Sequence, residues 1–477
     1  AGGTAGSTGG GAAGTAGARA SGGGGLGGSA GAGGAAGASG GSAGAAGSGG
    51  AGGSEMTFDP LPVAESKTAF PVGIQAGDPT QSAVVLWTKY AGTAPLVLRV
   101  YTPTTPGKAL VFFDSVVTPD AQGYLHVDAV GLPSLTELSY VFLEQQGPTS
   151  YAARSPIGRF VTAPAAGAKV KLRFGGTSCT KNDRAPFEAL TRAGEQKLDF
   201  FILAGDTTYN DSATTLADYR GKWLGQIGEG TYQDALQSTA HYATWDDHEV
   251  DNDWNPETFP AARFAAARQA YFEHLAIRRD SVTPDRVWRK FSWGDTLEVF
   301  VLDARSERKP STAAGPNAEY LSPVQLSWLT AGLKSSTAVF KIIVNSVPIT
   351  NFPGLFDFAA MDRWEGYSAQ RTKLLDFLIQ NKIPGVLFVS GDFHLGASAR
   401  VEPSGPWSPF REVLVGPGDY NGNPLWVSLP GPPHFDFKTG TSNVTIFEAD
   451  PNAVPPTISM KFIASDGATL HTQTLTY

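Results

Sequence analysis

Short apolar runs recur along the chain from Val170 onward, and most of them end in polar residues. Their length and composition predict buried strands at residues 169–178, 199–206, 241–247, 297–305, 340–348 and 385–392. Helical patterns lie between several of these runs, at residues 261–277, 322–333 and 371–381. Strands that alternate with helices predict a layered α/β domain, which we assign to residues 167–477. The runs 443–450 and 457–464 predict an antiparallel hairpin at its end.

The region before this domain, residues 57–166, has an all-β pattern. Gly- and Pro-rich turns separate strand-like runs at residues 83–90, 95–102, 109–117, 123–130, 138–145 and 158–164. This spacing is typical of a β-sandwich. We therefore predict a small all-β, Ig-like domain that precedes the α/β domain.

Residues 1–56 consist almost entirely of Gly, Ala, Ser and Thr. Such a segment has little to bury, and ordering its glycines costs conformational entropy, so we predict a disordered linker. A long spacer before a folded domain suits a protein tethered to a surface. We expect a protein exported to the periplasm, the cell surface or the extracellular medium, and the first residue, Ala1, fits a leader that has been removed.

Composition narrows the possible partners. Hydrophobic residues make up 41% of the chain, enough for a large core. The formal net charge of −8 argues against a broad nucleic-acid-binding surface, although a local metal cluster would still attract anionic substrates. Cys179 is the only cysteine, so the chain forms no internal disulfide, and no run approaches the roughly 20 apolar residues of a membrane helix. We expect a monomer.

Side chains able to hold a metal follow four of the predicted strands. They are Cys179 after the first strand, Asp206 and Tyr209 after the second, Asp247 after the third, and Asp392 and His394 after the last. Taken singly, each has an ordinary structural explanation, because a lone Cys packs in cores and an Asp after Gly often caps a turn. The carboxyl ends of strands in α/β sheets are also where ligands bind. The set as a whole therefore indicates a metal site.

Two local patterns support this interpretation. Asp246 and Asp247 are adjacent carboxylates after a mainly apolar run, and their repulsion at a buried place would need a cation to offset it. Asp392 and His394 are one residue apart in a strand-like segment, so we expect them to share a face and to point at one ion.

Several motifs resemble those of the calcineurin-like metallophosphoesterases, and most closely the alkaline phosphatase D (PhoD-like) family. They are GDTTY (205–209), WDDHE (245–249), SGDFHLG (390–396), VLDARSER (301–308) and FPVGIQAGDPTQSAVVLWTKY (70–90). The resemblance covers roughly residues 70–400. It implies a four-layer αββα metallophosphoesterase sandwich and a phosphatase or phosphodiesterase with two metal ions.

The differences between these motifs and those of the general metallophosphoesterase superfamily indicate which branch of it the chain resembles. The usual Asp-x-His block is absent and Cys179 stands at that strand end, while Asp247 takes the place of the usual Asn. Tyr209 resembles the tyrosine that binds ferric iron in purple acid phosphatases.

Ligand chemistry divides the residues into two sites. Cys179, Tyr209 and His394, with Asp206 bridging, suit a transition metal, and the resemblance implies Fe3+. The all-oxygen set of Asp206, Asp247 and Asp392 suits a hard cation, and the resemblance implies Ca2+. A further ligand candidate is Asn345, which could instead be a cap or turn residue, and weaker candidates are Asn252 and Asp253.

The expected reaction is in-line attack of a metal-bound hydroxide on phosphorus, without a covalent phosphoenzyme. His248, next to Asp247, would donate to a phosphate oxygen or protonate the leaving alkoxide; alternatively, it only holds Asp247 in place. Arg305 and Arg308 are candidates for phosphate contact, and a structural ion pair is the alternative.

Two other functions remain open at this stage. A metal-independent thiol hydrolase would use Cys179, His248 and an Asp, but it leaves Tyr209, Asp392 and His394 unexplained. A non-enzymatic binding protein on a surface tether is the second alternative. The substrate is expected to be a small-molecule or polymeric phosphate ester, and the sequence does not distinguish monoesters from diesters.

Overall fold

The computed structural model describes residues 54–56, 58–105, 108–352, 361–428 and 431–477. The predicted disordered linker lies outside these ranges, apart from its last three residues. Those residues form strand β1 (Ser54–Met56), which pairs antiparallel with β5 (Lys108–Val117). The last three residues of the predicted linker therefore pair with the folded region, while the boundary at residue 56 stays a prediction.

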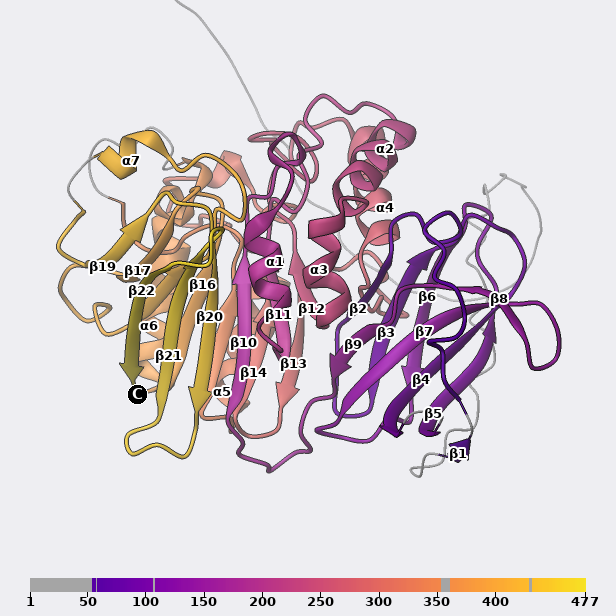
Figure 1. The fold of residues 1–477 in the computed structure, drawn as a ribbon. Coiled ribbons are helices and arrows are strands. Elements are labelled where there is room, and N and C mark those ends of the chain that lie inside the picture. The colour runs from indigo at the N-terminus through magenta and orange to yellow at the C-terminus, as the bar shows by residue number, and fades with distance from the viewer. Residues whose placement is uncertain (1–53, 57, 106–107, 353–360, 429–430) are drawn as a thin grey trace, which may run out of the picture. The chain divides into compact units, whose positions relative to one another are not determined.

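A nine-stranded sheet has the order β22-β21-β20-β10-β11-β12-β2-β3-β6. Its centre is a parallel set of β10 (Leu172–Thr177), β11 (Phe200–Ala204) and β12 (His241–Thr244). Beside β10 lie the antiparallel strands β20 (Asn443–Asp450), β21 (Thr457–Ala464) and β22 (Thr469–Thr476), as Figure 1 shows. The predicted C-terminal hairpin is thereby confirmed.

A seven-stranded sheet has the order β13-β14-β15-β16-β18-β17-β19. Its parallel strands are β14 (Leu297–Val301), β15 (Phe340–Val344), β16 (Val386–Ser390) and β18 (Arg411–Leu414). The antiparallel strands are β13 (Arg289–Trp293), β17 (Gly396–Arg400) and β19 (Phe435–Thr439).

The packing of β11 shows how the layers form. Phe200 and Ile202 belong to the core between the two sheets, whereas Phe201 and Leu203 belong to the core beneath a helical layer. That layer consists of α1 (Glu188–Gly194), α2 (Leu216–Ile227), α3 (Gly230–Ser238) and α4 (Ala261–His274). Since successive residues of a strand face opposite sides, an uninterrupted apolar run is what a sheet covered on both faces requires.

The outer face of the seven-stranded sheet is covered by α5 (Pro323–Ser335) and α6 (Ser368–Gln380). Leu329 and Leu374 of these helices share a core with Phe300 of β14. Together the cores give the order helices, sheet, sheet, helices, so the α/β prediction is confirmed. Among the described residues, no helix combines the length and the apolar content needed to cross a membrane.

The N-terminal strands form a sandwich that shares a sheet with the α/β region. One side is the six-stranded sheet of β1, β5, β4 (Leu96–Thr105), β7 (Glu137–Gln145), β8 (Tyr151–Arg154) and β9 (Gly158–Val161). The other side is β2 (Ile74–Gly77), β3 (Ala83–Lys89) and β6 (Tyr124–Val130), which continue the nine-stranded sheet. Gly77 of β2 pairs with His241 of β12. The Ig-like assignment of this region stays a prediction.

The predicted strands and helices are all present, but the apolar runs extend beyond the strands. β12 ends at Thr244 rather than residue 247, and β16 ends at Ser390 rather than residue 392. The helices α2 and α3 were not predicted, because this segment contains Gly221, Gly225, Gly228 and Gly230, and glycine is a poor helix former.

Candidate metal centre

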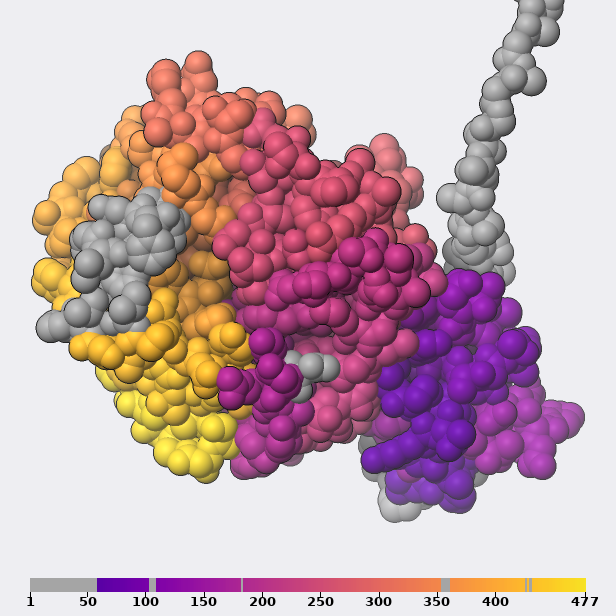
Figure 2. All heavy atoms as spheres, turned by 90° about the horizontal axis from the view of Figure 1, so that it is seen from above, coloured from indigo at the N-terminus to yellow at the C-terminus, as the bar shows by residue number. Residues whose placement is uncertain are grey.

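The predicted ligands follow the carboxyl ends of parallel strands in both sheets. Cys179 follows β10, Asp206 and Tyr209 follow β11, Asp247 follows β12, and Asp392 and His394 follow β16. Figure 2 views the molecule from above, the direction in which β10 points in Figure 1; there the magenta middle of the chain adjoins its orange and yellow C-terminal part. Residues more than 200 positions apart in the chain, such as Cys179 and His394, therefore meet at one edge of the sheets.

A left-handed backbone turn presents several of these side chains. The φ angles are 56° for Cys179, 52° for Asp206, 64° for Asp392 and 49° for His394. Non-glycine residues rarely adopt this region, and such strain is typically concentrated at functional sites. The expectation that Asp392 and His394 share a strand face is wrong, because the strand has ended and each residue reaches a different group of ligand atoms.

The ligand atoms form three overlapping groups, each with its atoms within 4.8 Å of one another. The groups are Cys179 with Asp206 and His394, Asp206 with Asp247 and His248, and Asp246 with Asp247 and Asp392. Tyr209 adjoins the first group, since its Oη donates to Oδ2 of Asp206 at 3.3 Å and lies 3.1 Å from Nε2 of His394. Cys179, Asp206, Tyr209, Asp247, Asp392 and His394 thus meet in one continuous cluster.

Burial makes it unfavourable for the acidic groups of this cluster to ionise when no cation is bound. Burial, followed by the charge of Asp206, raises the pKa of the Cys179 thiol well above its usual value. Burial likewise raises the pKa values of Asp206 and Asp392 well above those of ordinary carboxyl groups. Among the described residues, Oδ1 of Asp206 and Oδ2 of Asp246 are buried without a hydrogen-bond partner. Buried polar atoms are normally satisfied, so these oxygens fit a site built for cations.

The donor types fit two different cations. A thiol, a phenol and an imidazole lie together on the Cys179 side, which suits a transition metal. Burial, followed by the charge of His248, lowers the pKa of His394 to about 4, so its imidazole is in the neutral form that binds metals. The Asp247 and Asp392 side offers carboxylate oxygens, which suit a hard cation.

Asn345 follows β15 and is fully buried. Its amide nitrogen donates to the carbonyl of Val347, whereas its Oδ1 has no partner among the described residues. An unsatisfied buried oxygen is compatible with the predicted ligand role. Asp253 is the weaker ligand candidate. Its backbone N–H donates to Oδ2 of Asp247 at 2.6 Å.

Arg305 has no exposed surface and lies in a carboxylate network. Its guanidinium bonds Asp246, and its Nη2 lies 2.9 Å from Asp392 and 3.6 Å from Asp247. Nη1 lies 2.5 Å from Asp362, which also binds Arg308 at 2.6 Å. This geometry favours the structural ion pair over direct phosphate contact for both arginines. Asp362 itself was not singled out from the sequence, because its partners lie far away in the chain.

His248 is held by a residue that the sequence did not single out. Its Nδ1 lies 2.8 Å from Oδ1 of Asp211, and its ring packs on Tyr209 with centroids 4.0 Å apart. Burial lowers the pKa of His248, but the neighbouring carboxylates, led by Asp206, outweigh it and raise the pKa to about 10. A protonated His248 whose Nδ1–H donates to Asp211 has its Nε2–H left to donate elsewhere. Asp211 follows the GDTTY motif closely, which is the one signal that could have identified it.

The ring of Tyr420 lies against two side chains of the cluster. Its ring stacks on Tyr209 at 5.4 Å and meets the ring of His394 edge-on at 4.3 Å. The amino group of Lys181 lies 5.4 Å from the centroid of the same ring. No sequence motif marked Tyr420, because only the fold brings it beside Tyr209.

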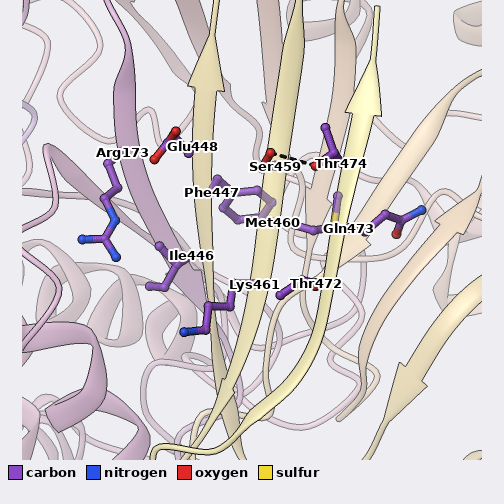
Figure 3. A pocket seen from close by; sticks show the side chains of 10 residues that line it. All are labelled: Arg173, Ile446, Phe447, Glu448, Ser459, Met460, Lys461, Thr472, Gln473 and Thr474. Carbon is purple, nitrogen blue, oxygen red and sulfur yellow. Dashed lines mark hydrogen bonds between the residues drawn. The ribbon is translucent and has the colours of Figure 1, made fainter.

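A separate hollow lies on the nine-stranded sheet, lined by residues of β10, β20, β21 and β22 (Figure 3). Its lining includes Arg173, Glu448, Lys461 and Thr472. None of the predicted ligands is among the lining residues, so the hollow is not part of the metal cluster.

Comparison with known proteins gives two family matches. The PhoD-like phosphatase family matches residues 174–422, and the PhoD-like phosphatase N-terminal domain matches residues 57–164. Alkaline phosphatase D of Bacillus subtilis (strain 168) is 29% identical over 385 residues, which cover 69% of this chain. The match spans 65% of the length of that relative.

Two solved structures share the fold. A structure of PhoD superposes with a TM-score of 0.72 at 23% identity, covering 86% of this chain and 89% of the other. A purple acid phosphatase from seeds of yellow lupin (Lupinus luteus) superposes with a TM-score of 0.61 at 13% identity, covering 87% and 75%.

Proposed function

Because this chain belongs to the PhoD-like phosphatase family, we propose that it is a metal-dependent phosphoric ester hydrolase that cleaves phosphate monoesters, diesters or both. One observation carries the proposal. Buried thiol and carboxylate groups converge with a half-buried phenol and imidazole at the strand ends, with carboxylate oxygens that no described residue satisfies. The relative from Bacillus subtilis, named alkaline phosphatase D, supports the same chemistry.

We assign the ligands to two sites. Cys179, Tyr209 and His394 would hold Fe3+, and Asp247 and Asp392 would hold Ca2+ with Asn345 as a further oxygen donor. Asp206 would bridge the sites, and its membership of two of the three ligand groups supports this role. The mixed soft and hard donor sets are the reason for proposing unlike metals.

A pair of bound metals would supply an acidified water as nucleophile and would offset negative charge on the phosphoryl oxygens. The chain itself contributes a proton donor. His248 is oriented by Asp211 and packed on Tyr209, so its Nε2–H can donate to a phosphate oxygen or to the leaving alkoxide. Arg305 holds Asp246, Asp247 and Asp392 in place rather than binding substrate.

The thiol hydrolase alternative is disfavoured by the surroundings of Cys179. The side chain is fully buried, and burial raises its thiol pKa, which opposes formation of a free thiolate. Its sulfur lies 3.3 Å from Oγ of Ser178, and the imidazole grouped with it is His394 rather than His248. A thiolate would therefore form here only as a metal ligand.

Export is also a proposal, supported by the Gly-, Ala- and Ser-rich segment that precedes the folded region. Fractionation of cells that express the protein from its natural gene would test it, and retention in the cytoplasm would contradict it. We further propose that the protein is a monomer, which sedimentation of the purified chain would test.

Metal analysis and hydrolysis assays together test the proposed function. The purified protein should contain iron and calcium, should show a charge-transfer absorption from the Tyr209 and Cys179 ligands, and should lose activity toward p-nitrophenyl phosphate or bis-p-nitrophenyl phosphate on chelation. Activity that survives chelation would favour the thiol hydrolase. Activity that survives the combined Cys179→Ser, Asp206→Ala and His394→Ala changes would refute the metal centre.

A further inference from the structure

Glu249 lies beside the metal cluster, has no exposed surface, and accepts hydrogen bonds from three backbone N–H groups. Its Oε2 accepts from Asp206 at 3.2 Å and from Asp246 at 2.8 Å. Its Oε1 accepts from Thr207 at 2.6 Å. One carboxylate thus connects the loop after β11 to the loop after β12.

These two loops carry the proposed ligands Asp206 and Asp247. Asp206 has a φ of 52°, so its loop adopts a conformation that needs support from its surroundings. Because Thr207 and Asp246 direct their N–H groups at the same carboxylate, movement of one loop away from the other would break a buried hydrogen bond. Such bonds are costly to leave unmade.

Glu249 itself is not placed to bind a metal. Both of its oxygens are engaged by backbone donors, and it belongs to none of the ligand groups formed by the described residues. Its own backbone adds a further connection, because Nδ2 of Asn210 donates to the Glu249 carbonyl at 2.9 Å. The side chain therefore acts on the ligands only through the backbone of the two loops.

We propose that Glu249 is a positioning residue that sets the separation of Asp206 and Asp247, and thereby the affinity of the centre for its metals. This inference rests on the proposed two-metal function. Partners of metal ligands typically change metal affinity about 10- to 100-fold when they are removed.

Glu249→Gln is the direct test, because the amide keeps the size of the side chain but turns one acceptor into a donor that faces N–H groups. Purified holoprotein would be dialysed against increasing concentrations of EDTA, and iron and calcium would be measured by mass spectrometry. We expect the variant to lose metal at an EDTA concentration about 10- to 100-fold lower than wild type.

Asp199→Asn is the matched control. Asp199 is a half-buried carboxylate that likewise accepts a backbone N–H, from Arg173 at 2.7 Å, but it precedes β11 and so lies at the opposite end of the strand. This control should retain metal like wild type even if its thermal unfolding temperature falls. If Glu249→Gln does not fold, Glu249→Asp keeps the charge and withdraws the carboxylate by one methylene; it should lose metal at a several-fold lower EDTA concentration.

The outcomes separate the two proposals. A wild-type protein without bound metal would refute the proposed function itself. A metal-containing wild type whose Glu249 variants retain metal equally well would refute only the positioning role. Equal metal loss in Asp199→Asn would also refute it, because the effect would then follow general stability.

Discussion

Gly391 offers a sharp test of how closely the ligand-bearing loops approach one another. A methyl group at this position would lie 2.5 Å from Cβ of Ser178 and 2.6 Å from the carbonyl oxygen of Ala204. Neither neighbour can turn aside easily, because Ala204 contributes backbone and the Ser178 hydroxyl donates to the carbonyl of Val415 at 2.6 Å. Relief therefore requires the loops before Cys179, Asp206 and Asp392 to separate.

Overpacking of this kind costs about 1–3 kcal/mol, and we expect Gly391→Ala to lie near the upper end because backbone must move. Denaturant unfolding of the metal-free protein measures this loss, and dialysis against EDTA measures the accompanying loss of metal. Gly221→Ala is the control, since its added methyl meets nothing within 4 Å on helix α2 and should stabilise by up to about 1 kcal/mol. A Gly391→Ala protein with wild-type stability and metal retention would show that the loops are not packed as described.

Three further predictions concern other ionisable side chains. Asp211→Asn should lower kcat about tenfold with little change in KM, because His248 loses its charged partner; an unchanged kcat for an ester with a poor leaving group would contradict the proton-donor role. Arg305→Met should destabilise the protein by about 3–5 kcal/mol in denaturant unfolding, because it leaves buried carboxylates unpaired, and wild-type stability would contradict this. Burial lowers the pKa of His274 to about 4, so below pH 6.5 the unfolded chain takes up a proton that the folded chain does not. The contribution of His274 to stability should therefore fall by on the order of 3 kcal/mol between pH 6.5 and pH 4, and unfolding curves of His274→Gln should show a pH dependence smaller by this amount than those of wild type.

The strands of the α/β region were predictable because their composition reports burial on both faces. Residues 200–204 are an unbroken apolar run, residues 340–344 are apolar except for Lys341, and both are central strands covered on two sides. The helices α2 and α3 were not predictable in the same way. Their glycines weaken the local helical preference, and the helices are stabilised instead by packing of Trp223 and Tyr232 into the core that they share with the sheet.

The division of the N-terminal region from the rest was only partly visible. The all-β pattern of residues 57–166 located most of the sandwich strands but missed β2 and β8, and it did not show that β2, β3 and β6 continue the nine-stranded sheet. Pairing between Gly77 and His241 joins segments more than 160 residues apart, and no local pattern records such a partner.

The ligand residues could be predicted because residue type and position after an apolar run are both visible in the sequence. Cys179, Asp206, Tyr209, Asp247, Asp392 and His394 each follow an apolar run, and the carboxyl ends of parallel strands share one edge. That argument uses only the order of residues along the chain, so the sequence by itself was sufficient to propose a metal centre.

The tertiary structure decided how the ligands are presented and which residues support them. Left-handed backbone at Cys179 and Asp392, the burial of Arg305 among carboxylates, and the bonds from Asp211 and Glu249 depend on contacts between distant segments. Cys179 illustrates the difference. Sequence indicated that its thiol stands at a strand end, but only the fold brings Asp206 and His394 against it. Asp206 is brought close by the pairing of β10 with β11, and His394 by the packing of the two sheets.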